Sequence, residues 1–419
     1  MQNLPGFRDF PPEDCARRNY ILNTWRSVAR RYGFVEYDGP TLESVELYAK
    51  KNESGAEIMQ QLYSFEDRGG RPVALRPEMT PTLARMVAAR EKQYKKPIKW
   101  FSSSTFFRYE RQQKGRLREF IQLNCDLIGE TGPAADAEVL ALGIDLVRAF
   151  GFGPEDFVVR LSDRKAWMDF LAARGVPKAH FGTVLQAADK IERESPDSLN
   201  AKLAPAGLTV DDLKAFIASG SPDSFRPLIE ELTARGLAGY VEVDLSIVRG
   251  LAYYTGVVFE VFDRSKSMRA LAGGGRYDDL IAGLSDGAAN LSAMGFGMGD
   301  VVLANFIGET PKAAERMAAA LAADAPVDVY VIIADATRRA EGLQTVQALR
   351  DAGWKADFSL AGAKVGKQFQ AAEGLGAKFA VVVGGEWPEV KVKTLATRQE
   401  VQVPQSGLAD WLKSGENSL

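Results

Sequence analysis

The chain has few of the residues that most often build metal sites and nucleophilic catalytic centres. Its 419 residues include two cysteines and one histidine. Cys15 and Cys125 lie far apart and outside any CxxC or Cys/His cluster, which argues against a disulfide framework and a structural zinc site. His180 has no second histidine to pair with, which argues against HExxH and Ser-His-Asp chemistry. We expect His180 to be structural and any catalysis to depend on charge and positioning.

Long apolar runs are absent as well. No run approaches the roughly 20 apolar residues that cross a membrane, and the start, MQNLPGFRDFPPED, has no apolar core of signal-peptide length. Together with the scarce cysteines, this leads us to expect a cytoplasmic protein that does not associate with membranes. The formal net charge of −3 argues against nonspecific coating of nucleic acid but allows a local basic groove.

The length of the chain predicts two or three domains. A helix is predicted at about 12–32, where Pro12 suits a first turn, and another begins at Thr80-Pro81. An antiparallel sheet is the simplest assembly for the strands of residues 1–325, with an all-helical insertion at about 164–239. Residues 326–419 alternate strands with helices, which indicates a separate α/β domain of parallel strands.

The most informative segment is residues 107–126, FRYERQQKGRLREFIQLNCD. Its second half alternates apolar residues with residues on one largely polar face, which is typical of a half-buried strand. These face residues are Arg118, Phe120, Gln122, Asn124 and Asp126. In the first half, Arg108 and Glu110 share one face. A hairpin is therefore expected to bring Arg108 toward Asp126.

The loop of this hairpin is basic, with Arg111, Lys114 and Arg116 around Gly115. Such charges can contact phosphates without reading a base. The segment predicts a pocket for a charged small molecule beside a polyanion. An ordinary solvated hairpin is the alternative that the same pattern allows.

Four segments carry a family resemblance. In order and spacing, LRPEMT, FRYERQQKGRLREFIQLNCD, VRGLAYYTGVVFE and AGGGRYDDL resemble the signatures of histidyl-tRNA synthetases, which are class II aminoacyl-tRNA synthetases. VGKQFQAAEGLGAKFAVVVGG resembles their anticodon-binding domain. The resemblance covers nearly the whole chain. It implies an α+β antiparallel-sheet class II catalytic domain with a helical insertion, followed by a C-terminal α/β anticodon-binding domain.

The resemblance implies a ligase that activates L-histidine with ATP and Mg²⁺ to histidyl-adenylate and pyrophosphate. Histidine would then pass to the 3′ end of tRNA(His). No protein nucleophile is needed, because fixed guanidinium groups and Mg²⁺ can stabilise the charge that develops on the phosphoryl oxygens. A homodimer is expected, since the early helix and the Pro40 segment resemble the first class II signature. No metal ligand from the protein is assigned.

Individual roles also follow from the resemblance. Arg108 and Arg249 would be catalytic and would hold the α-phosphate from two sides. Histidine would be bound by Glu78, Thr80, Gln122, Asp126, Tyr253 and Tyr254, with the first two on the α-amino group and Asp126 and Tyr254 on the imidazole. ATP would be bound by Arg108, Arg116, Arg249 and Arg276, and the tRNA acceptor end by Arg111 and Gln113. Glycines 273–275 fit either a tight turn or a close backbone approach to a ligand.

The sequence departs from the family pattern at several positions. Val302 stands where the third class II signature usually has an arginine, Ala252 replaces the aspartate of RGLDYY, Gln112 replaces the proline of ERPQ, and Ile121 replaces the histidine of FHQ. These departures fit a divergent branch of the family in which Arg116 or Arg276 grips ATP instead.

Two alternatives belong to different functional classes. A catalytically inactive paralog could act as the histidine-sensing regulatory subunit of ATP phosphoribosyltransferase. That regulatory subunit generally lacks an anticodon domain. An RNA-binding adaptor of synthetase shape is the second alternative. We favour the synthetase, because a mere sensor would not need to keep Arg108 and Arg249.

We predict that Arg249→Ala lowers the rate of adenylate formation by about 10²–10³, the range for losing a preorganised charge-stabilising donor. Histidine-dependent exchange of labelled pyrophosphate into ATP measures this rate. Near-normal exchange in the variant would remove Arg249 from the mechanism.

Overall fold

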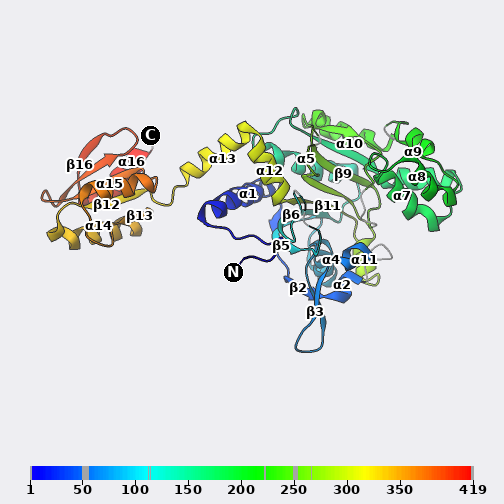
Figure 1. Cartoon of the computed structure of the whole chain (residues 1–419), viewed down its shortest axis with the longest axis horizontal. Coiled ribbons are helices and arrows are strands. Elements are labelled where there is room, and N and C mark those ends of the chain that lie inside the picture. The colour runs from blue at the N-terminus through cyan, green and yellow to red at the C-terminus, as the bar shows by residue number, and fades with distance from the viewer. Residues whose placement is uncertain are drawn as a thin grey trace. The chain divides into compact units, whose positions relative to one another are not determined.

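The computed structural model describes residues 2–49, 56–111, 113, 115–220, 223–248, 253–265 and 267–416 (Figure 1). The chain forms two compact units, Met1–Met317 and Ala318–Leu419, which are described separately below. The division falls within helix α13 (Pro311–Ala323), shortly before the boundary that the sequence places near residue 325. None of the helices in the described ranges is long and apolar enough to cross a membrane.

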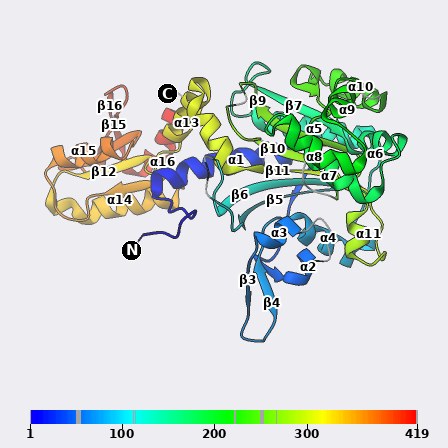
Figure 2. The ribbon, with the colours of Figure 1, turned by 45° about the vertical axis from the view of Figure 1, so that its right-hand side comes forward.

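An eight-stranded sheet forms the centre of the first unit (Figure 2). From one edge to the other its strands are β1 (Val35–Glu36), β5 (Ile98–Phe107), β6 (Glu119–Ile128), β11 (Ala293–Gly299), β10 (Ala272–Arg276), β9 (Val257–Asp263), β7 (Phe157–Asp163) and β8 (Val241–Val243). The edge pairs β1–β5 and β7–β8 are parallel, and the other neighbours are antiparallel. The predicted antiparallel sheet that holds the polar hairpin is confirmed.

Helices bury one face of this sheet in the largest core of the unit. They are α1 (Pro12–Arg31), α5 (Pro133–Arg148), α10 (Arg226–Ala234) and α12 (Asp300–Glu309). Helix α1 starts at the predicted proline, carries Glu13 and Asp14 in its first turn, and buries Trp25 and Val28. The helix predicted at about 12–32 is therefore confirmed to within one residue.

Strand β6 has two different faces. Leu123, Cys125 and Leu127 join the core, and Asn124 and Asp126 are buried on the opposite face. Arg108 and Asp126 line the same cavity, but they are not paired across the two strands of the hairpin. Asp126 lies opposite Trp100, whereas the Arg108 amide donates to the carbonyl of Arg118 beyond the last strand pair. Because each strand residue adds about 3.3 Å, the two side chains lie toward opposite ends of a long hairpin.

The start of β6 is tied to distant parts of the chain. The carbonyl of Gly6 accepts from the amides of Arg118 and Glu119 at 3.1 and 3.0 Å. Asp300, the first residue of α12, accepts from the Ile121 amide at 2.9 Å and from Arg8 Nη2 at 2.7 Å. Burial raises the pKa of Asp300, while the charge of Arg8 opposes this shift. This one carboxylate thus joins the N-terminal segment, β6 and α12.

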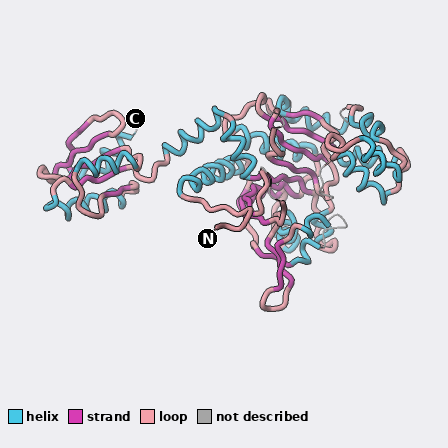
Figure 3. The backbone as a smooth tube through the Cα atoms, viewed as in Figure 1, coloured by secondary structure: helices cyan, strands magenta, loops and turns pink. Residues whose placement is uncertain are grey.

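A smaller sheet of order β2-β4-β3 lies beside the hairpin, built from β2 (Leu42–Ser44), β4 (Pro72–Leu75) and β3 (Tyr63–Glu66). Strands β3 and β4 project from the body of the unit (Figure 3). Helices α2 (Val45–Ala49) and α3 (Ala56–Gln60) lie between β2 and β3 in the chain, and α4 (Thr80–Ala89) follows β4. Helix α4 begins at Thr80 with Pro81 in its first turn, as predicted, and leaves Glu78 at the corner after β4.

Between β7 and β8 the described residues form helices and no strands, in the range where the sequence predicts an insertion at about 164–239. Helices α6 (Arg164–Ala173), α7 (Phe181–Asp189), α8 (Pro196–Leu203) and α9 (Val210–Ile217) share a core of their own that includes Trp167, Leu185 and Leu213 (Figure 1, green). Helix α10 packs against α5 instead. The single histidine, His180, is half-buried at the start of α7.

The second unit has a five-stranded sheet of order β13-β12-β14-β15-β16. Its strands are β12 (Val329–Ile333), β13 (Ala356–Phe358), β14 (Phe379–Val383), β15 (Glu389–Thr394) and β16 (Glu400–Pro404), and its helices are α14 (Arg339–Asp351), α15 (Val365–Gly374) and α16 (Leu408–Glu416). The first three strands of this order are parallel, as predicted. Strands β15 and β16 are antiparallel, so the expectation of parallel strands alone is wrong.

We predict that Asp300→Ala lowers the free energy of unfolding of the first unit by about 3 kcal/mol. The substitution leaves the partly buried Arg8 and the Ile121 amide without their hydrogen-bond acceptor. Asp300→Asn, which retains an acceptor for the Ile121 amide, should cost less. Urea titration measures both variants.

The matched control is Asp169→Ala. Asp169 pairs with Lys165 at 2.6 Å on an exposed helix face, and such pairs contribute less than about 1 kcal/mol. Equal losses in the Asp300→Ala and Asp169→Ala variants would show that the Arg8–Asp300 pair does not hold the N-terminal segment.

Candidate active site

Three adjoining cavities lie in the first unit. The inner cavity, of about 250 Å³, reaches from Asp126 to Arg108. The middle cavity, of about 290 Å³, continues past Arg108 and Phe120 to Val302. The outer cavity, of about 720 Å³, extends from Arg116 and Arg269 toward Arg193 of the insertion. The inner and middle cavities together fall within the usual range for small-molecule sites, about 300–1,000 Å³.

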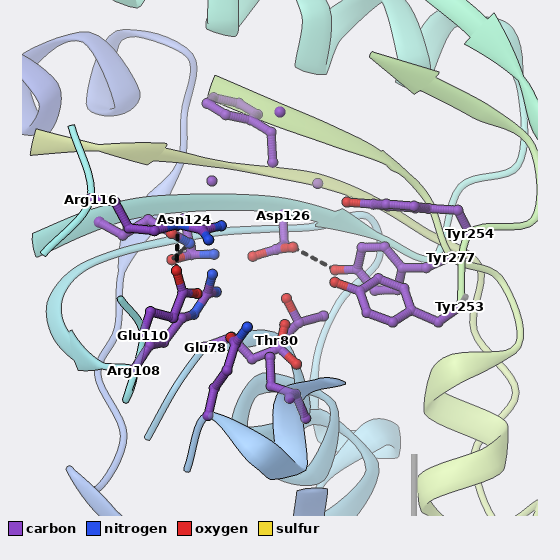
Figure 4. A pocket seen from close by; sticks show the side chains of 17 residues that line it. Glu78, Thr80, Arg108, Glu110, Arg116, Asn124, Asp126, Tyr253, Tyr254 and Tyr277 are labelled. Carbon is purple, nitrogen blue, oxygen red and sulfur yellow. Dashed lines mark hydrogen bonds and ion pairs between the residues drawn. The ribbon is translucent and has the colours of Figure 1, made fainter. Parts of the chain in front are cut away.

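The inner cavity brings together all six residues that the sequence predicts to bind histidine. They are Glu78, Thr80, Gln122, Asp126, Tyr253 and Tyr254. Glu78 and Thr80 come from the β4–α4 corner, and Gln122 and Asp126 come from the polar face of β6. Figure 4 shows Asp126 in the middle, the tyrosines on one side and Arg108 with Arg116 on the other. The two ends of the cavity therefore differ in charge.

Asp126 is the most deeply buried carboxylate of this site, with 2% of its surface exposed. Tyr277 Oη donates to Asp126 Oδ1 at 2.5 Å, whereas Oδ2 has no hydrogen-bond partner in the described part of the chain. Burial raises the pKa of Asp126 to about 7, although the Tyr277 hydrogen bond opposes the shift. One oxygen is thus held in place while the other is ready to accept from a ligand.

Tyr277 is a residue of this site that sequence reasoning missed. Its ring also packs edge-on against Tyr253, with the ring centroids 5.9 Å apart. The available signal was its place in AGGGRYDDL, directly after the glycine run and Arg276. Glycines 273–275 belong to strand β10, so the tight turn considered for them does not form.

Two glycines of β11 make the floor of the cavity. A Cβ atom added at Gly295 would collide with Asp126, and one added at Gly297 would collide with Gln122. Gly295 lies opposite Asp126 in the sheet, and Gln122 donates to Asn124 at 3.0 Å. The bare backbone of β11 therefore leaves the polar face of β6 open to a ligand.

The other end of the inner cavity is cationic. Arg108 is positioned by a hydrogen bond from its Nε to the Pro77 carbonyl at 2.9 Å and lies over the ring of Phe120, 5.3 Å from its centroid. Arg116 forms an ion pair with the buried Glu110. Arg108 lines the inner and middle cavities, and Arg116 lines all three. These guanidinium groups can hold a carboxylate or a phosphate where the cavities meet.

The remaining predicted site residues lie elsewhere. Arg276 does not line these cavities, since its Nη2 contacts Asp136 at 2.5 Å and its Nη1 contacts Asp278 at 3.1 Å. Arg111 and Gln113 are exposed on the hairpin loop. Arg249 lies outside the described residues. The departures at Gln112 and Ala252 lie outside them too.

The described ranges contain no group of three or more His, Cys, Asp and Glu side chains that could hold a metal ion. Two carboxylates, Glu110 and Glu260, line the middle cavity. Mg²⁺ is often held by one or two carboxylates together with substrate phosphates and water. These residues therefore fit a Mg²⁺ ion that arrives with a polyphosphate.

We predict that Asp126→Asn stabilises the protein at about pH 8 by roughly 1–3 kcal/mol, the cost of burying a polar group without full compensation. The folded protein keeps a proton on Asp126 up to about pH 7, whereas an ordinary carboxyl group loses it near 3.8. Stability from this carboxyl is therefore greatest at low pH and is lost as the pH rises through about 7.

Urea titrations at about pH 4 and pH 8 measure this difference between wild type and the Asp126→Asn variant. The stabilisation should be present at the higher pH and small at the lower one. Equal effects at both values would mean that the Asp126 pKa is not raised.

Comparison with known proteins shows the family of this chain. The family model described as Histidyl-tRNA synthetase matches residues 6–299, and the one described as Anticodon binding domain matches residues 328–415. The histidine–tRNA ligase of Opitutus terrae is 44% identical over 97% of this chain and 96% of its own. The chloroplastic/mitochondrial histidine–tRNA ligase of Arabidopsis thaliana is 37% identical over 96% of this chain and 85% of its own.

Solved structures show the same fold. Histidyl-tRNA synthetase from Nostoc sp. PCC 7120 has a TM-score of 0.76 at 23% identity and covers 99% of both chains. A Bacillus halodurans structure, described as an ATP phosphoribosyltransferase regulatory subunit/histidyl-tRNA synthetase, has a TM-score of 0.70 at 23% identity and covers 88% of this chain and 96% of its own. With the family match over residues 6–299 and the near full-length relatives, the chain belongs to the histidyl-tRNA synthetase family.

Proposed function

We propose that this protein is a histidine–tRNA ligase. It activates L-histidine with ATP to histidyl-adenylate and pyrophosphate and then transfers histidine to the 3′ end of tRNA(His). The observation that carries this proposal is a single cavity with a buried carboxylate, Asp126, between tyrosines on one side and guanidinium groups on the other. Full-length relatives named histidine–tRNA ligase support it.

The inner cavity matches the three polar parts of histidine. Asp126 Oδ2 accepts from an imidazole N–H, next to Tyr254. Glu78 and Thr80 bind the α-ammonium group from the β4–α4 corner. Arg108 binds the α-carboxylate where the inner and middle cavities meet. A carboxylate facing each N–H-bearing end and an arginine facing the carboxylate is the arrangement that histidine chemistry requires.

The same junction positions the reacting atoms. The histidine carboxylate oxygen attacks the α-phosphorus of ATP, a new O–P bond forms, and the bond to pyrophosphate breaks. Arg108, with Arg249 as predicted from the resemblance, stabilises the negative charge on the α-phosphoryl oxygens. Glu260 and the triphosphate would hold Mg²⁺ in the middle cavity, where the ion supplies charge neutralisation.

The tRNA contacts belong to two regions. Arg111 and Gln113, exposed on the hairpin loop beside the outer end of the site, are proposed to meet the acceptor end. The second unit, which matches the Anticodon binding domain, is proposed to bind the anticodon arm. Phosphate contacts from such basic loops position RNA without specifying its sequence.

A homodimer in the cytoplasm completes the proposal. Val35, Leu42 and Phe65 are large apolar side chains that are 63%, 40% and 51% exposed, on β1, β2 and β3. Val35 and Leu42 lie in the part of the chain that resembles the first class II signature, and subunit contacts in symmetric dimers commonly bury such side chains. Sedimentation of the purified chain tests this association.

The histidine-sensing regulatory subunit is the alternative from another class. The match to the Anticodon binding domain over residues 328–415 favours the ligase, since the regulatory subunit generally lacks that domain. Incubating the purified protein with histidine, ATP and labelled pyrophosphate separates the two functions. Histidine-dependent exchange supports the ligase, whereas histidine binding without exchange would overturn it in favour of the sensor. An RNA-binding adaptor would show neither exchange nor histidine binding.

We predict that Asp126→Ala reduces discrimination for histidine over isosteres without a ring N–H by up to about 10⁴, because a site built around a hydrogen bond rejects ligands that cannot make it. Pyrophosphate-exchange rates with histidine and with these isosteres, compared as kcat/KM, measure the discrimination. Asp410→Ala, an exposed change in the second unit, is the control. Unchanged selectivity in the Asp126→Ala variant would mean that another residue reads the ring.

A further inference from the structure

We propose that Arg269 binds the β- and γ-phosphates of ATP and takes the place of the arginine that Val302 replaces. Arg269 is not among the residues that the sequence resemblance assigns. The inference rests on the proposed function, because it names a residue for one of the substrates of that reaction.

Arg269 and Val302 flank the same point of the hairpin loop. A Cβ atom added at Gly115 would lie 3.2 Å from Val302 Cγ2 and 3.7 Å from Arg269 Cδ. Both residues line the middle and the outer cavities. Arg269 comes from the connection between β9 and β10, whereas Val302 comes from α12. A guanidinium group therefore reaches the wall beside Val302 from a different element.

The order of the cavities assigns Arg269 to the outer phosphates. Arg108, Gln122 and Gly297 are shared by the inner and middle cavities, so the α-phosphorus must lie there to meet the histidine carboxylate. Glu260, Arg269 and Val302 are shared by the middle and outer cavities. A triphosphate that begins at Arg108 and extends outward arrives between Arg116 and Arg269, and the outer cavity gives pyrophosphate a way out.

The electrostatics of this end of the site favour an anion. Burial and the charge of Arg116 lower the pKa of Arg269, whereas Glu110 and Glu260 have the opposite effect. Arg269 Nη1 donates to Gln113 at 3.4 Å, which is long for a hydrogen bond. Two guanidinium groups that face one cavity repel each other, and a phosphate between them converts this repulsion into attraction.

Arg276, the other candidate for this role, is engaged differently. Its guanidinium is buried against Asp136 and Asp278, away from the three cavities. Arg116 already pairs with Glu110. Within the described residues, Arg269 is thus the arginine next to Val302 that forms no ion pair with a carboxylate.

The test compares Arg269→Ala with Arg264→Ala in the full-length protein. Arg264 lies in the same β9–β10 connection, pairs with Glu242 at 2.7 Å and does not line the cavities. We expect Arg269→Ala to lower kcat/KM for ATP in pyrophosphate exchange by about 10², as for the loss of one preorganised donor. The KM for histidine and the binding of AMP should stay at their wild-type values, and Arg264→Ala should behave as wild type.

A rescue variant gives a second, independent test. Arg269→Ala combined with Val302→Arg moves the guanidinium to the neighbouring wall of the same cavity and should recover most of the lost kcat/KM for ATP. Arg269→Gln replaces Arg269→Ala in these measurements if circular dichroism shows that the alanine variant is unfolded.

Unchanged kcat/KM for ATP in the position-269 variant would overturn the inference. Equal weakening of ATP and AMP binding would also overturn it, because the residue would then contact the part that both nucleotides share. Equilibrium binding of ATP, measured without histidine, tests the role of Arg269 independently of whether the protein catalyses the ligase reaction. If the wild-type protein shows no pyrophosphate exchange but binds ATP more tightly than the variant, the result supports ATP binding by Arg269 and contradicts the proposed ligase reaction.

Discussion

The structure depends on one strand, β6, that is buried on both faces although one face is polar. Its apolar face completes the core beneath α5, and its polar face forms the bottom of the inner cavity. Burying Asn124 and Asp126 costs free energy that only hydrogen bonds and a ligand can offset. The surrounding elements meet that condition, since β11 presents bare backbone opposite β6 and Tyr277 donates to Asp126.

The position of β6 is in turn fixed by contacts from remote segments. Gly6 and Asp300 accept from the backbone amides at its start, and Arg8 pairs with Asp300. Asp300 also begins α12, the helix that carries Val302. The same residue therefore joins the start of the strand that lines the inner cavity to the helix whose Val302 lines the middle cavity, and its carboxylate forms an ion pair in which Asp300 is buried and Arg8 is partly exposed.

Much of this arrangement could be predicted from the sequence, because period-two patterns and proline positions act locally. The polar face of β6, helix α1 and the start of α4 follow directly from their residues. What depends on register or on distant partners could not be predicted. Arg108 and Asp126 share a cavity but not a strand position, and Arg276 of β10 pairs with Asp136 of helix α5. Tyr277, which follows β10, reaches Asp126 of β6 across the intervening strand β11. Strands β15 and β16 were not predicted, although residues 390–393 alternate valine and lysine with the period of a strand.

The raised pKa of Asp126 has a consequence for how a titratable side chain can enter a protein interior. That pKa, about 7, lies close to the ordinary imidazole value of about 6.5. Near neutral pH the Asp126 carboxyl group and a bound imidazole ring can therefore share one proton. The pair is then either a protonated carboxyl group beside a neutral imidazole, or a carboxylate beside an imidazolium. Both arrangements have the same net charge of zero. The deepest part of the cavity thus takes in a basic side chain without burying an uncompensated charge, whichever of the two groups carries the proton.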